Sequence, residues 1–343
     1  MNHQHQEPFV RGSRNDLLAK FWNRQVLLVQ EALGGMVLPG SQVVFIDMPV
    51  YLNIGDLMIY LGTERWMESQ KLRILGRWTI HNFTFPELLP GATILLQGGG
   101  NFGDLYPFQG FRERVVERYP NHRIVFLPQT IHYSDPAAQE TTKRTLEKHT
   151  DLHLSFRDRR SLAHAREMLP KCHHELSPDM SVHLYPLEPK VSQDGAESDK
   201  GVIYLLRKDI EKRIDVEVPD LGSGWTGDWR NLIGYRGWYL RGLKLTHHQL
   251  GRIGPAGKFA SIWRNSSEQI VKYCAMRFAS ASHVISSRLH GHLLASLLGV
   301  PNTVLDNSYG KNSAYFSTWH RDLPFASLAG NATGDSPEDG NER

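Results

Sequence analysis

Two arginines and one histidine stand where a parallel sheet would expose them. Ser286-Ser287-Arg288-Leu289-His290-Gly291 follows a short apolar run and precedes a stretch of helical length. A helix N-terminus offers free N–H groups and a partial positive charge, so it favours an anion. Arg288 adds a permanent cation that can hold a phosphate or carboxylate through two N–H groups. His290 can donate a proton near neutral pH.

Arg207 ends another apolar run, Gly201–Leu206, further back in the chain. Because the carboxyl ends of parallel strands meet at one edge of a sheet, we expect Arg207 to lie near Arg288. Together with the helix N-terminus, the two arginines would suit a donor that carries two anionic groups. Each residue alone has a simpler explanation. An arginine at a strand end is often only solvated, and a single histidine is often a structural hydrogen-bonding group.

A glycine-rich segment, Gly98-Gly99-Gly100-Asn101-Phe102-Gly103, follows an apolar run and fits the spacing of a dinucleotide-binding turn. Two features count against that interpretation. The next helix is expected only at Pro107, and the following strand ends in Leu127-Pro128-Gln129 with no acidic residue for a ribose hydroxyl. The alternatives are a tight turn with positive φ, or backbone that comes close to a ligand at the edge of the sheet, with Asn101 and Asp104 as polar contacts.

Metal ligation is not predicted. Cys172 and Cys274 are the two cysteines of the chain, too few and too distant for a disulfide framework or a zinc site. His290 and His292 are two residues apart and would point to different faces of a helix. The adjacent histidine pairs lack a cysteine or acidic partner at ligand spacing: His173-His174 and His247-His248.

Length and composition predict an ordinary two-domain globular protein. The chain has 343 residues, of which 40% are apolar and 22% charged, with a net charge of +3. The basic residues are scattered, which argues against a nucleic-acid-binding surface. No secretory signal is evident, and no apolar run approaches a membrane span of about 20 residues. We therefore expect the cytoplasm, with docking at the inner face of the membrane left open.

Short apolar runs alternate with amphipathic stretches of helical length, which predicts an α/β fold with parallel sheets. The expected strands are 43–46, 93–97, 123–127, 152–156, 174–176, 201–206, 284–286 and 303–305. The expected helices are 17–33, 53–69, 107–119, 136–149, 159–168, 268–280 and 291–298. The predicted organisation is two Rossmann-like domains that face a cleft. Its parts are a flexible N-terminus (1–16), a first domain (17–190), a linker (191–200), a second domain (201–325) and a flexible tail (326–343).

Residues 210–262 are expected to form a long irregular insertion rich in Trp and Gly. The aromatic faces of Trp225, Trp229 and Trp238 could stack on the apolar side of a sugar ring, although tryptophans that simply pack within a loop are equally consistent with the sequence.

Several motifs in order resemble the polysaccharide pyruvyl transferases, over about residues 40–320, and most closely the branch that forms ketals on exopolysaccharides. The motifs are Phe45–Asp56 (FIDMPVYLNIGD), Leu95–Tyr106 (LLQGGGNFGDLY), Leu127–Thr130 (LPQT), Phe156–Asp158 (FRD), Ser177–Asp179 (SPD) and Ser287–Gly291 (SRLHG).

The resemblance implies transfer of a pyruvyl group from phosphoenolpyruvate, a substrate rather than a cofactor, to a hexose of an exopolysaccharide or its lipid-linked repeat unit. It also implies a fold like the two-domain GT-B glycosyltransferases. The implied donor-binding residues are Arg207, Arg288, Leu289, His290 and Gly291. His290 is the expected acid or leaving-group partner, and Asp104 or Asp56 the expected base. The acceptor side would hold Asn53, Gly99, Gly100, Asn101, Trp225 and Trp229.

Two other functions remain open from the sequence. A GT-B glycosyltransferase would use the same helix N-terminus for the diphosphate of a nucleotide sugar, and would need a pocket for base and ribose. A non-catalytic polysaccharide-binding protein would need aromatic platforms but no paired arginines. The peripheral machinery of polysaccharide assembly at a membrane is a further expected partner.

Overall fold

Two parallel β-sheets form the framework of the protein. The computed structural model describes residues 11–188, 201–250 and 257–330. In the first sheet the strand order is β2-β1-β3-β5-β6-β7, and β4 also pairs with β5. The strands are β1 (Gln42–Ile46), β2 (Arg73–Arg77), β3 (Thr93–Leu96), β4 (Gly99–Gly103), β5 (Ile124–His132), β6 (Leu152–Phe156) and β7 (His173–Leu176). Every pairing is parallel.

The second sheet has the order β12-β11-β10-β8-β9, and its pairings are also parallel. Its strands are β8 (Val202–Leu205), β9 (Gly224–Gly227), β10 (His283–Ser286), β11 (Asn302–Val304) and β12 (Ala326–Leu328). In both sheets the first strand of the half lies between the second and the third. The chain therefore reverses its direction of travel between β1 and β3 and between β8 and β10. Such a switch point opens a crevice at the carboxyl ends of the strands, where ligands of open α/β sheets bind.

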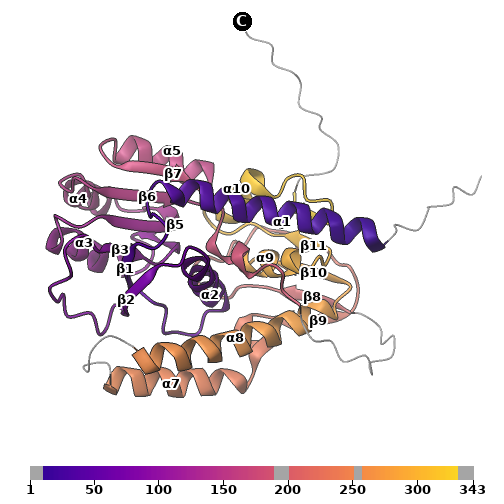
Figure 1. The fold of residues 1–343 in the computed structure, drawn as a ribbon. Helices are drawn as coiled ribbons and strands as arrows, with labels where there is room; N and C mark the ends of the chain where they lie inside the picture. The colour runs from indigo at the N-terminus through magenta and orange to yellow at the C-terminus, as the bar shows by residue number, and fades with distance from the viewer. Residues whose placement is uncertain (1–10, 189–200, 251–256, 331–343) are drawn as a thin grey trace, which may run out of the picture.

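Helices connect the strands and cover the sheets (Figure 1). In the first half they are α1 (Arg11–Gly34), α2 (Ile54–Ser69), α3 (Gln109–Arg118), α4 (Pro136–Leu146), α5 (Arg159–Met168) and the 3₁₀-helix η1 (Met180–Leu184). In the second half they are α6 (Trp229–Ile233), α7 (Arg236–Leu250), α8 (Gly257–Ala279), α9 (Leu289–Leu297) and α10 (Lys311–Trp319). Side chains of Asn53, Asp135 and Asp158 accept N–H groups in the first turns of α2, α4 and α5 and so determine where these helices begin.

The predicted alternation of strands and helices is confirmed, but several boundaries were wrong. The second part of the segment 210–262 is helical, with α6, α7 and the start of α8, and Leu232, Ile233 and Leu240 are buried at helical spacing, whereas residues 210–228 contain no helix. The N-terminal helix begins at Arg11, within the predicted flexible segment 1–16. The beginning of the predicted flexible tail, 326–343, forms β12, which pairs with β11. The predicted linker 191–200 lies outside the described residues.

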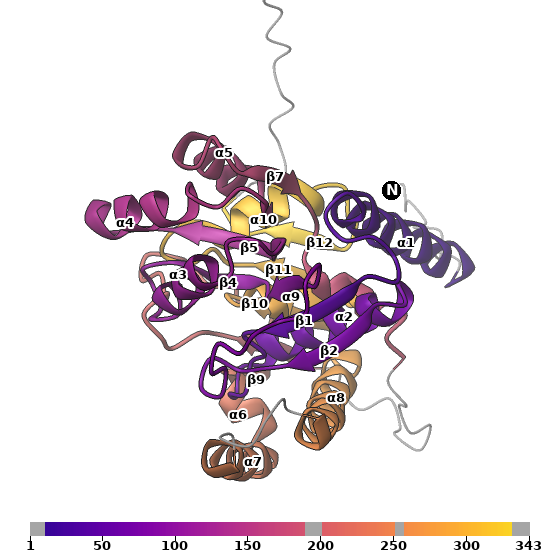
Figure 2. The same ribbon diagram turned by 60° about the vertical axis from the view of Figure 1, so that its left-hand side comes forward.

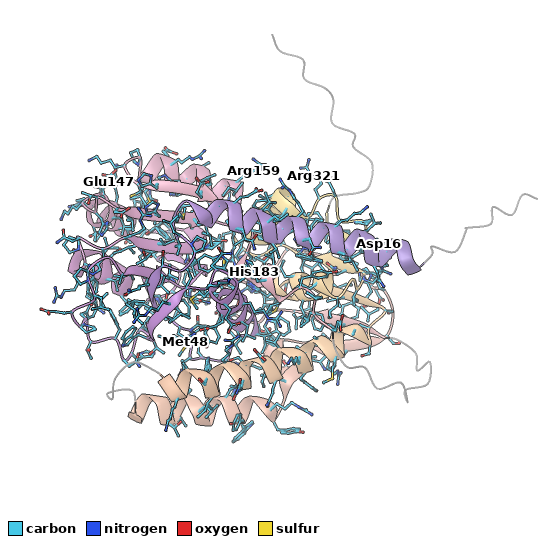
Figure 3. All side chains as sticks on the ribbon, viewed as in Figure 1. Asp16, Met48, Glu147, Arg159, His183 and Arg321 are labelled. Carbon is cyan, nitrogen blue, oxygen red and sulfur yellow. The ribbon has the colours of Figure 1, made fainter. Side chains whose placement is uncertain are left out.

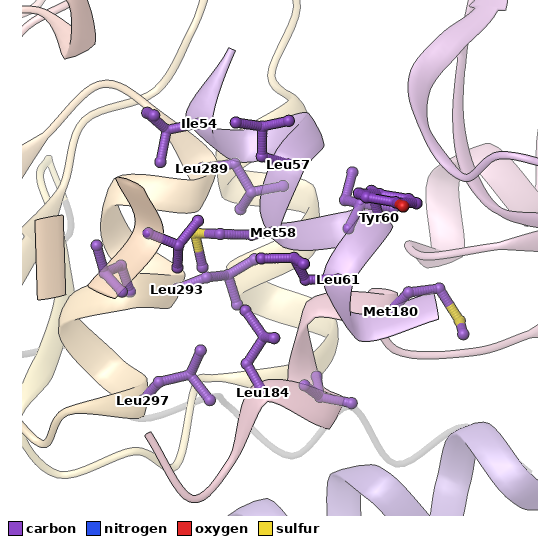
Figure 4. Close-up of a cluster of buried hydrophobic side chains, with 14 of the residues drawn as sticks. Ile54, Leu57, Met58, Tyr60, Leu61, Met180, Leu184, Leu289, Leu293 and Leu297 are labelled. Atoms are coloured by element: carbon purple, nitrogen blue, oxygen red, sulfur yellow. The ribbon is translucent and has the colours of Figure 1, made fainter. Parts of the chain in front are cut away.

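One apolar cluster crosses from one half to the other. Helix α2 of the first half packs on α9 of the second half and on η1 between them, as the close-up in Figure 4 shows. Ile54, Leu57, Met58 and Leu61 of α2 face Leu289 and the leucines that follow it on α9. The halves are therefore joined by a dry, close-packed interface and not by the covalent chain alone.

Three helices strengthen this connection. Helix α1 runs from the first half onto the second, where Trp22 donates to the carbonyl of Ser296 at 3.3 Å and Leu18 packs on Gly299. Trp263 of α8 donates to the carbonyl of Pro49 at 3.0 Å, and Trp319 of α10 donates to the carbonyl of Arg157 at 2.8 Å. Figure 3 shows side chains filling the space between the two halves, with His183 of η1 near its middle.

We expect Leu293→Ala, which empties a fully buried position of α9, to lower the free energy of unfolding by about 2–5 kcal/mol. Because the cluster is shared, wild type and variant should each unfold in a single transition in urea, followed by circular dichroism and tryptophan fluorescence. Leu38→Ala, at a position 64% exposed, is the matched control and should change stability little. Two separate transitions, or equal effects of the two substitutions, would show that the halves are independent.

Candidate active site

A pocket of about 260 Å³ lies where the two switch points meet. Its lining comes from β4 and from the segments after β1, β4 and β6 in the first half, and from the segments after β8, β9, β10 and β11 in the second. The lining residues are Tyr51, Asn53, Gly55, Asp56, Gly100, Asn101, Tyr106, Phe108, Arg157, Arg207, Glu211, Trp229, Arg288, Leu289, His290 and Lys311. The predicted residues Arg207, Arg288 and His290 are thus brought to one pocket, together with Asp56 from the opposite half.

Arg207 and Arg288 lie side by side because they share a carboxylate. Asp209 accepts from Nε of Arg207 at 2.9 Å, and its other oxygen lies 2.6 Å from Nη1 of Arg288. Arg288 also donates to both oxygens of Asp228, at 3.0 and 2.5 Å. Arg207 donates to Glu211 at 2.7 Å. Asp209 and Asp228 are not part of the lining, so they orient the guanidinium groups from behind the pocket wall.

Glu211 is the centre of a buried network that includes Lys311. The amine of Lys311 donates to Glu211 at 2.6 Å, and the hydroxyl of Tyr106, from the first half, donates to its other oxygen at 2.7 Å. Burial would raise the pKa of Glu211, but Lys311 and Arg207 outweigh it and hold the pKa well below its usual range. Burial lowers the pKa of Lys311 to about 8, although Glu211 favours the charged form.

His290 stands between the two halves. Its Nε2 lies 3.5 Å from Oδ1 of Asp179, whose other oxygen accepts from Arg157 at 2.6 Å. Burial would raise the pKa of Asp179, yet His290 and Arg157 hold it far below its usual value. On the other side, the ring packs on the N-terminus of α2, where a Cβ at Gly55 would lie 2.6 Å from Nδ1. The position next to His290 therefore has room only for glycine.

Asp56 is the acidic group of the first half in this pocket. Asn53 caps α2 and donates from its side-chain nitrogen to Asp56 at 2.7 Å, which fixes the carboxylate. Burial raises the pKa of Asp56 above its ordinary value, although His290 and a hydrogen bond from Tyr51 oppose the shift. A carboxyl with a raised pKa beside a histidine is the arrangement expected of groups that exchange protons.

The predicted Gly-rich turn is instead a short strand, β4, that pairs with β5. Gly99 and Gly103 have φ values of 124° and 125°, which only glycine adopts readily, so the expectation of positive φ is confirmed. Gly100 and Asn101 line the pocket, whereas Gly99 does not. A Cβ at Gly100 would lie 3.5 Å from Nη2 of Arg157 and 3.6 Å from Nζ of Lys311, so two cations face this bare backbone.

Asp104 is not at the site, which corrects its prediction as a catalytic base. Its carboxylate accepts from the backbone N–H groups of Ser134 and Asp135 and from the Ser134 hydroxyl, at 2.6–3.0 Å. The reversal of the chain after Gly103 turns the side chain toward the loop before α4. Asp104 therefore has a structural role, as an acceptor for otherwise unpaired N–H groups.

The tryptophans and α9 residues divide between pocket and core. Trp229 lines the pocket but is only 5% exposed, because its ring stacks on Phe278 at 5.8 Å. Trp225 is half-buried on β9 and lies outside the lining. Leu289 lines the pocket and joins the shared cluster, and Gly291 allows α9 to approach Ser286 of β10. An exposed sugar platform made by Trp225 and Trp229 is therefore not observed.

Four cations line the pocket, namely Arg157, Arg207, Arg288 and Lys311. Each of them is paired with a carboxylate, from Asp179, Asp209, Asp228 or Glu211. The N-terminus of α9 adds its first N–H groups, and Arg288 at the N-cap forms no side-chain cap that would occupy them. The arrangement suits a small ligand with more than one anionic group.

Several lining residues were missed from the sequence. Arg157 and its partner Asp179 lie within two quoted motifs, Phe156–Asp158 and Ser177–Asp179, but neither was assigned a role. Tyr51 also lies within a quoted motif, Phe45–Asp56, without an assigned role, whereas Lys311 and Glu211 had no local signal, since each reaches the pocket only through the fold. Within residues 11–188, 201–250 and 257–330, no group of three or more His, Cys, Asp or Glu is arranged to hold a metal ion.

Known proteins share this sequence and fold. The family model for polysaccharide pyruvyl transferase matches residues 53–309. A Bacillus subtilis (strain 168) protein named "Putative pyruvyl transferase EpsO" is 36% identical over 317 residues, which is 90% of this chain and 95% of that protein. Pyruvyl transferase 1 of Schizosaccharomyces pombe (strain 972 / ATCC 24843) is 27% identical over 81% of this chain and 70% of its own length.

A solved structure has a similar fold. It is a functionally uncharacterised protein, KP1_0663, from Klebsiella pneumoniae subsp. pneumoniae NTUH-K2044, and it matches with a TM-score of 0.52 at 18% identity. The match covers 94% of this chain and 99% of that one, so the likeness extends over both sheets.

Gly55→Ala tests how closely α2 is fitted to His290. A methyl group at this position would contact Nδ1 at 2.6 Å, so we expect the ring to move and the distance to Asp179 to lengthen. NMR of ring-labelled histidine should show a shifted His290 resonance with the fold retained. Gly110→Ala, where a Cβ meets nothing within 4 Å, is the control. An unchanged His290 resonance in Gly55→Ala would contradict this packing.

Proposed function

The chain belongs to the polysaccharide pyruvyl transferase family and is a pyruvyl transferase, and we propose that its donor is phosphoenolpyruvate and its product a pyruvate ketal on a hexose. The proposed acceptor is an exopolysaccharide or its lipid-linked repeat unit. Phosphoenolpyruvate is a substrate in this reaction, which needs no further cofactor.

The observation that carries the proposal is the cationic pocket at the two facing switch points. Phosphoenolpyruvate bears a phosphate and a carboxylate, and the adjacent Arg207 and Arg288 are the cations that would receive them, through N–H groups now shared with Asp209, Asp228 and Glu211. The volume of about 260 Å³ lies just below the usual range of ligand pockets, which are roughly 300–1,000 Å³. A compact phosphorylated acid suits it better than a nucleotide sugar.

We assign the two halves to the two substrates. Residues of the second half, after β8 and β10, would hold the donor, and residues of the first half, after β1 and β3, the acceptor. The facing carboxyl edges of two parallel sheets support an arrangement like that of GT-B glycosyltransferases, with a first domain over 17–190 and a second over 201–325, extended by the start of α1 and by β12.

The proposed reaction begins with transfer of a proton to the methylene carbon of phosphoenolpyruvate, which leaves positive charge at C2. One sugar hydroxyl then adds to C2 and loses its proton to a base. A neighbouring hydroxyl then displaces phosphate, which leaves with its bonding electron pair and takes up the proton that this hydroxyl loses, and the ketal is complete. We assign His290 as the acid that serves the donor and its leaving phosphate, and Asp56 as the base on the acceptor side.

Acceptor recognition is assigned to the loops of the first half. Asn53, Gly100 and Asn101 offer polar and backbone groups to sugar hydroxyls. Tyr51 and Phe108, which stack at 6.1 Å in the lining, would supply the apolar surface that a sugar ring needs. In this role they replace Trp225, which lies elsewhere.

Calorimetry with phosphoenolpyruvate, UDP and GDP tests the donor. We expect the wild type to bind phosphoenolpyruvate and neither nucleotide. Arg288→Ala or Arg207→Ala should weaken binding by about 2–5 kcal/mol, or roughly 30-fold and more, because a charged donor contact is lost. Arg213→Ala is the control, since that exposed arginine pairs with Asp215 outside the pocket.

His290→Ala should keep donor binding and reduce phosphate release about 10²–10⁴-fold. Nucleotide binding without phosphoenolpyruvate binding would refute the proposal.

The pH dependence of kcat/KM for phosphoenolpyruvate tests Lys311. Its pKa of about 8 means that the amine is charged below this pH and neutral above it, so kcat/KM should fall as pH rises through about 8. Lys311→Arg keeps the charge, and Lys311→Met removes it, so neither variant should show this inflection. Lys208→Arg, an exposed lysine of the same half, should retain it. An inflection that persists in Lys311→Arg and Lys311→Met would assign it to another group.

A further inference from the structure

In one segment of the chain, all the Lys, Arg, Asp and Glu positions are basic. Residues 229–267 contain seven Lys and Arg and no Asp or Glu, although the whole chain has nearly equal numbers of both signs. The basic residues are Arg230, Arg236, Arg241, Lys244, Arg252, Lys258 and Arg264. Helix α7 lies within this segment and forms the outermost element of the molecule, beyond α8 (Figures 1 and 2).

Helix α7 presents aromatic and aliphatic side chains to solvent. Its inner face packs on α6 and α8, with Leu240 only 1% exposed. Trp238, Tyr239 and Leu245 on its outer face are 73%, 60% and 67% exposed, and Tyr235 just before the helix is 74% exposed. The spacing 235, 238, 239 and 245 places all four on one side of a helix.

Cations accompany this apolar face. Arg230, Arg241 and Lys244 are exposed, and Arg236 is held in place with its guanidinium 4.0 Å from the centre of the Tyr273 ring. Trp and Tyr combine an apolar ring with a polar group, and basic residues beside them are typical of helices that lie in the headgroup region of a bilayer. No helix among the described residues is long and apolar enough to cross a membrane, so contact made by such a helix is at the surface.

We propose that the outer face of α7, defined by Tyr235, Trp238, Tyr239 and Leu245, with Arg241 at its edge and the exposed Lys244 in the same helix, docks the protein on the surface of an anionic lipid bilayer. Charge complementarity identifies this occupant. A second copy of the same face would bring like charges together, whereas anionic headgroups attract the exposed Arg230, Arg241 and Lys244.

The position of α7 gives the docking a consequence for the pocket. Gly237 of α7 lies against Leu52, where a Cβ would be 3.0 Å from Cδ2, and Leu52 is flanked by the lining residues Tyr51 and Asn53. Trp229, the first residue of α6, also lines the pocket. A docked α7 therefore holds the acceptor side of the pocket near the bilayer. Only the placement of the acceptor side near the bilayer rests on the proposed function. That placement would favour a lipid-linked acceptor over a free polymer.

Sedimentation of the full chain with vesicles tests the docking without any donor or acceptor. We expect binding to vesicles that contain phosphatidylglycerol, little binding to pure phosphatidylcholine, and weakening with added salt. The double variants Arg241→Glu/Lys244→Glu and Trp238→Ala/Tyr239→Ala should each lose at least about tenfold in vesicle affinity, as expected when several charged or apolar contacts with the bilayer are removed. Phosphate release with a soluble acceptor should remain unchanged in both, because none of these residues lines the pocket.

The matched control is Lys148→Glu/Lys171→Glu, which makes the same change in net charge at two exposed lysines outside α7 and should bind vesicles as wild type does. Anionic vesicles should also shift wild-type tryptophan emission to shorter wavelength, and Trp238→Phe should reduce that shift. Equal binding by all variants, or no binding at all, would overturn the proposal. So would a wild-type dimer that Trp238→Ala/Tyr239→Ala converts to a monomer without vesicle binding.

Discussion

The pocket depends on carboxylates that hold cations from behind. Burying a charge is expensive unless it is paired and hydrogen-bonded, and here Arg207, Arg288 and Lys311 satisfy that condition through Asp209, Asp228 and Glu211. The pairs are arranged so that part of each cation still faces the pocket. Every nitrogen of the Arg207 and Arg288 guanidinium groups lies against one of these carboxylates, so an anion that binds here must share or replace some of these contacts.

The pocket also requires that the two halves keep a fixed position relative to each other. Tyr106 of the first half donates to Glu211 of the second, and His290 of the second half lies between Gly55 and Asp179 of the first. Each of these contacts would be lost if the sheets moved apart by a few ångströms. The apolar cluster of α2, α9 and η1 and the crossing of α1 supply the rigidity. The interface between the two halves therefore stabilises the fold and also keeps the pocket residues in contact.

The segment that matches the family model contains most of the residues that line the pocket. The family model covers the segment from Asn53 to Tyr309, which includes nearly all of the pocket lining, and Lys311 lies just beyond it. Helix α7 also lies within the segment that the family model matches, but none of its residues lines the pocket. Its exposed aromatic rings form the proposed docking surface, and Gly237 of the same helix lies against Leu52 of the loop after β1.

The sequence by itself determined the elements and the chemical character of the site. Alternating apolar runs and amphipathic stretches predicted the parallel sheets, and the Ser-Arg-Leu-His-Gly turn at a strand-to-helix junction predicted an anion site, because strand ends and helix starts are local features. The tertiary structure decided which distant side chains meet. It turned Asp104 away from the pocket, brought in Arg157, Glu211 and Lys311, and made helices of the segment expected to be irregular. Contacts between residues a hundred or more positions apart depend on strand order and helix packing, which no local pattern records.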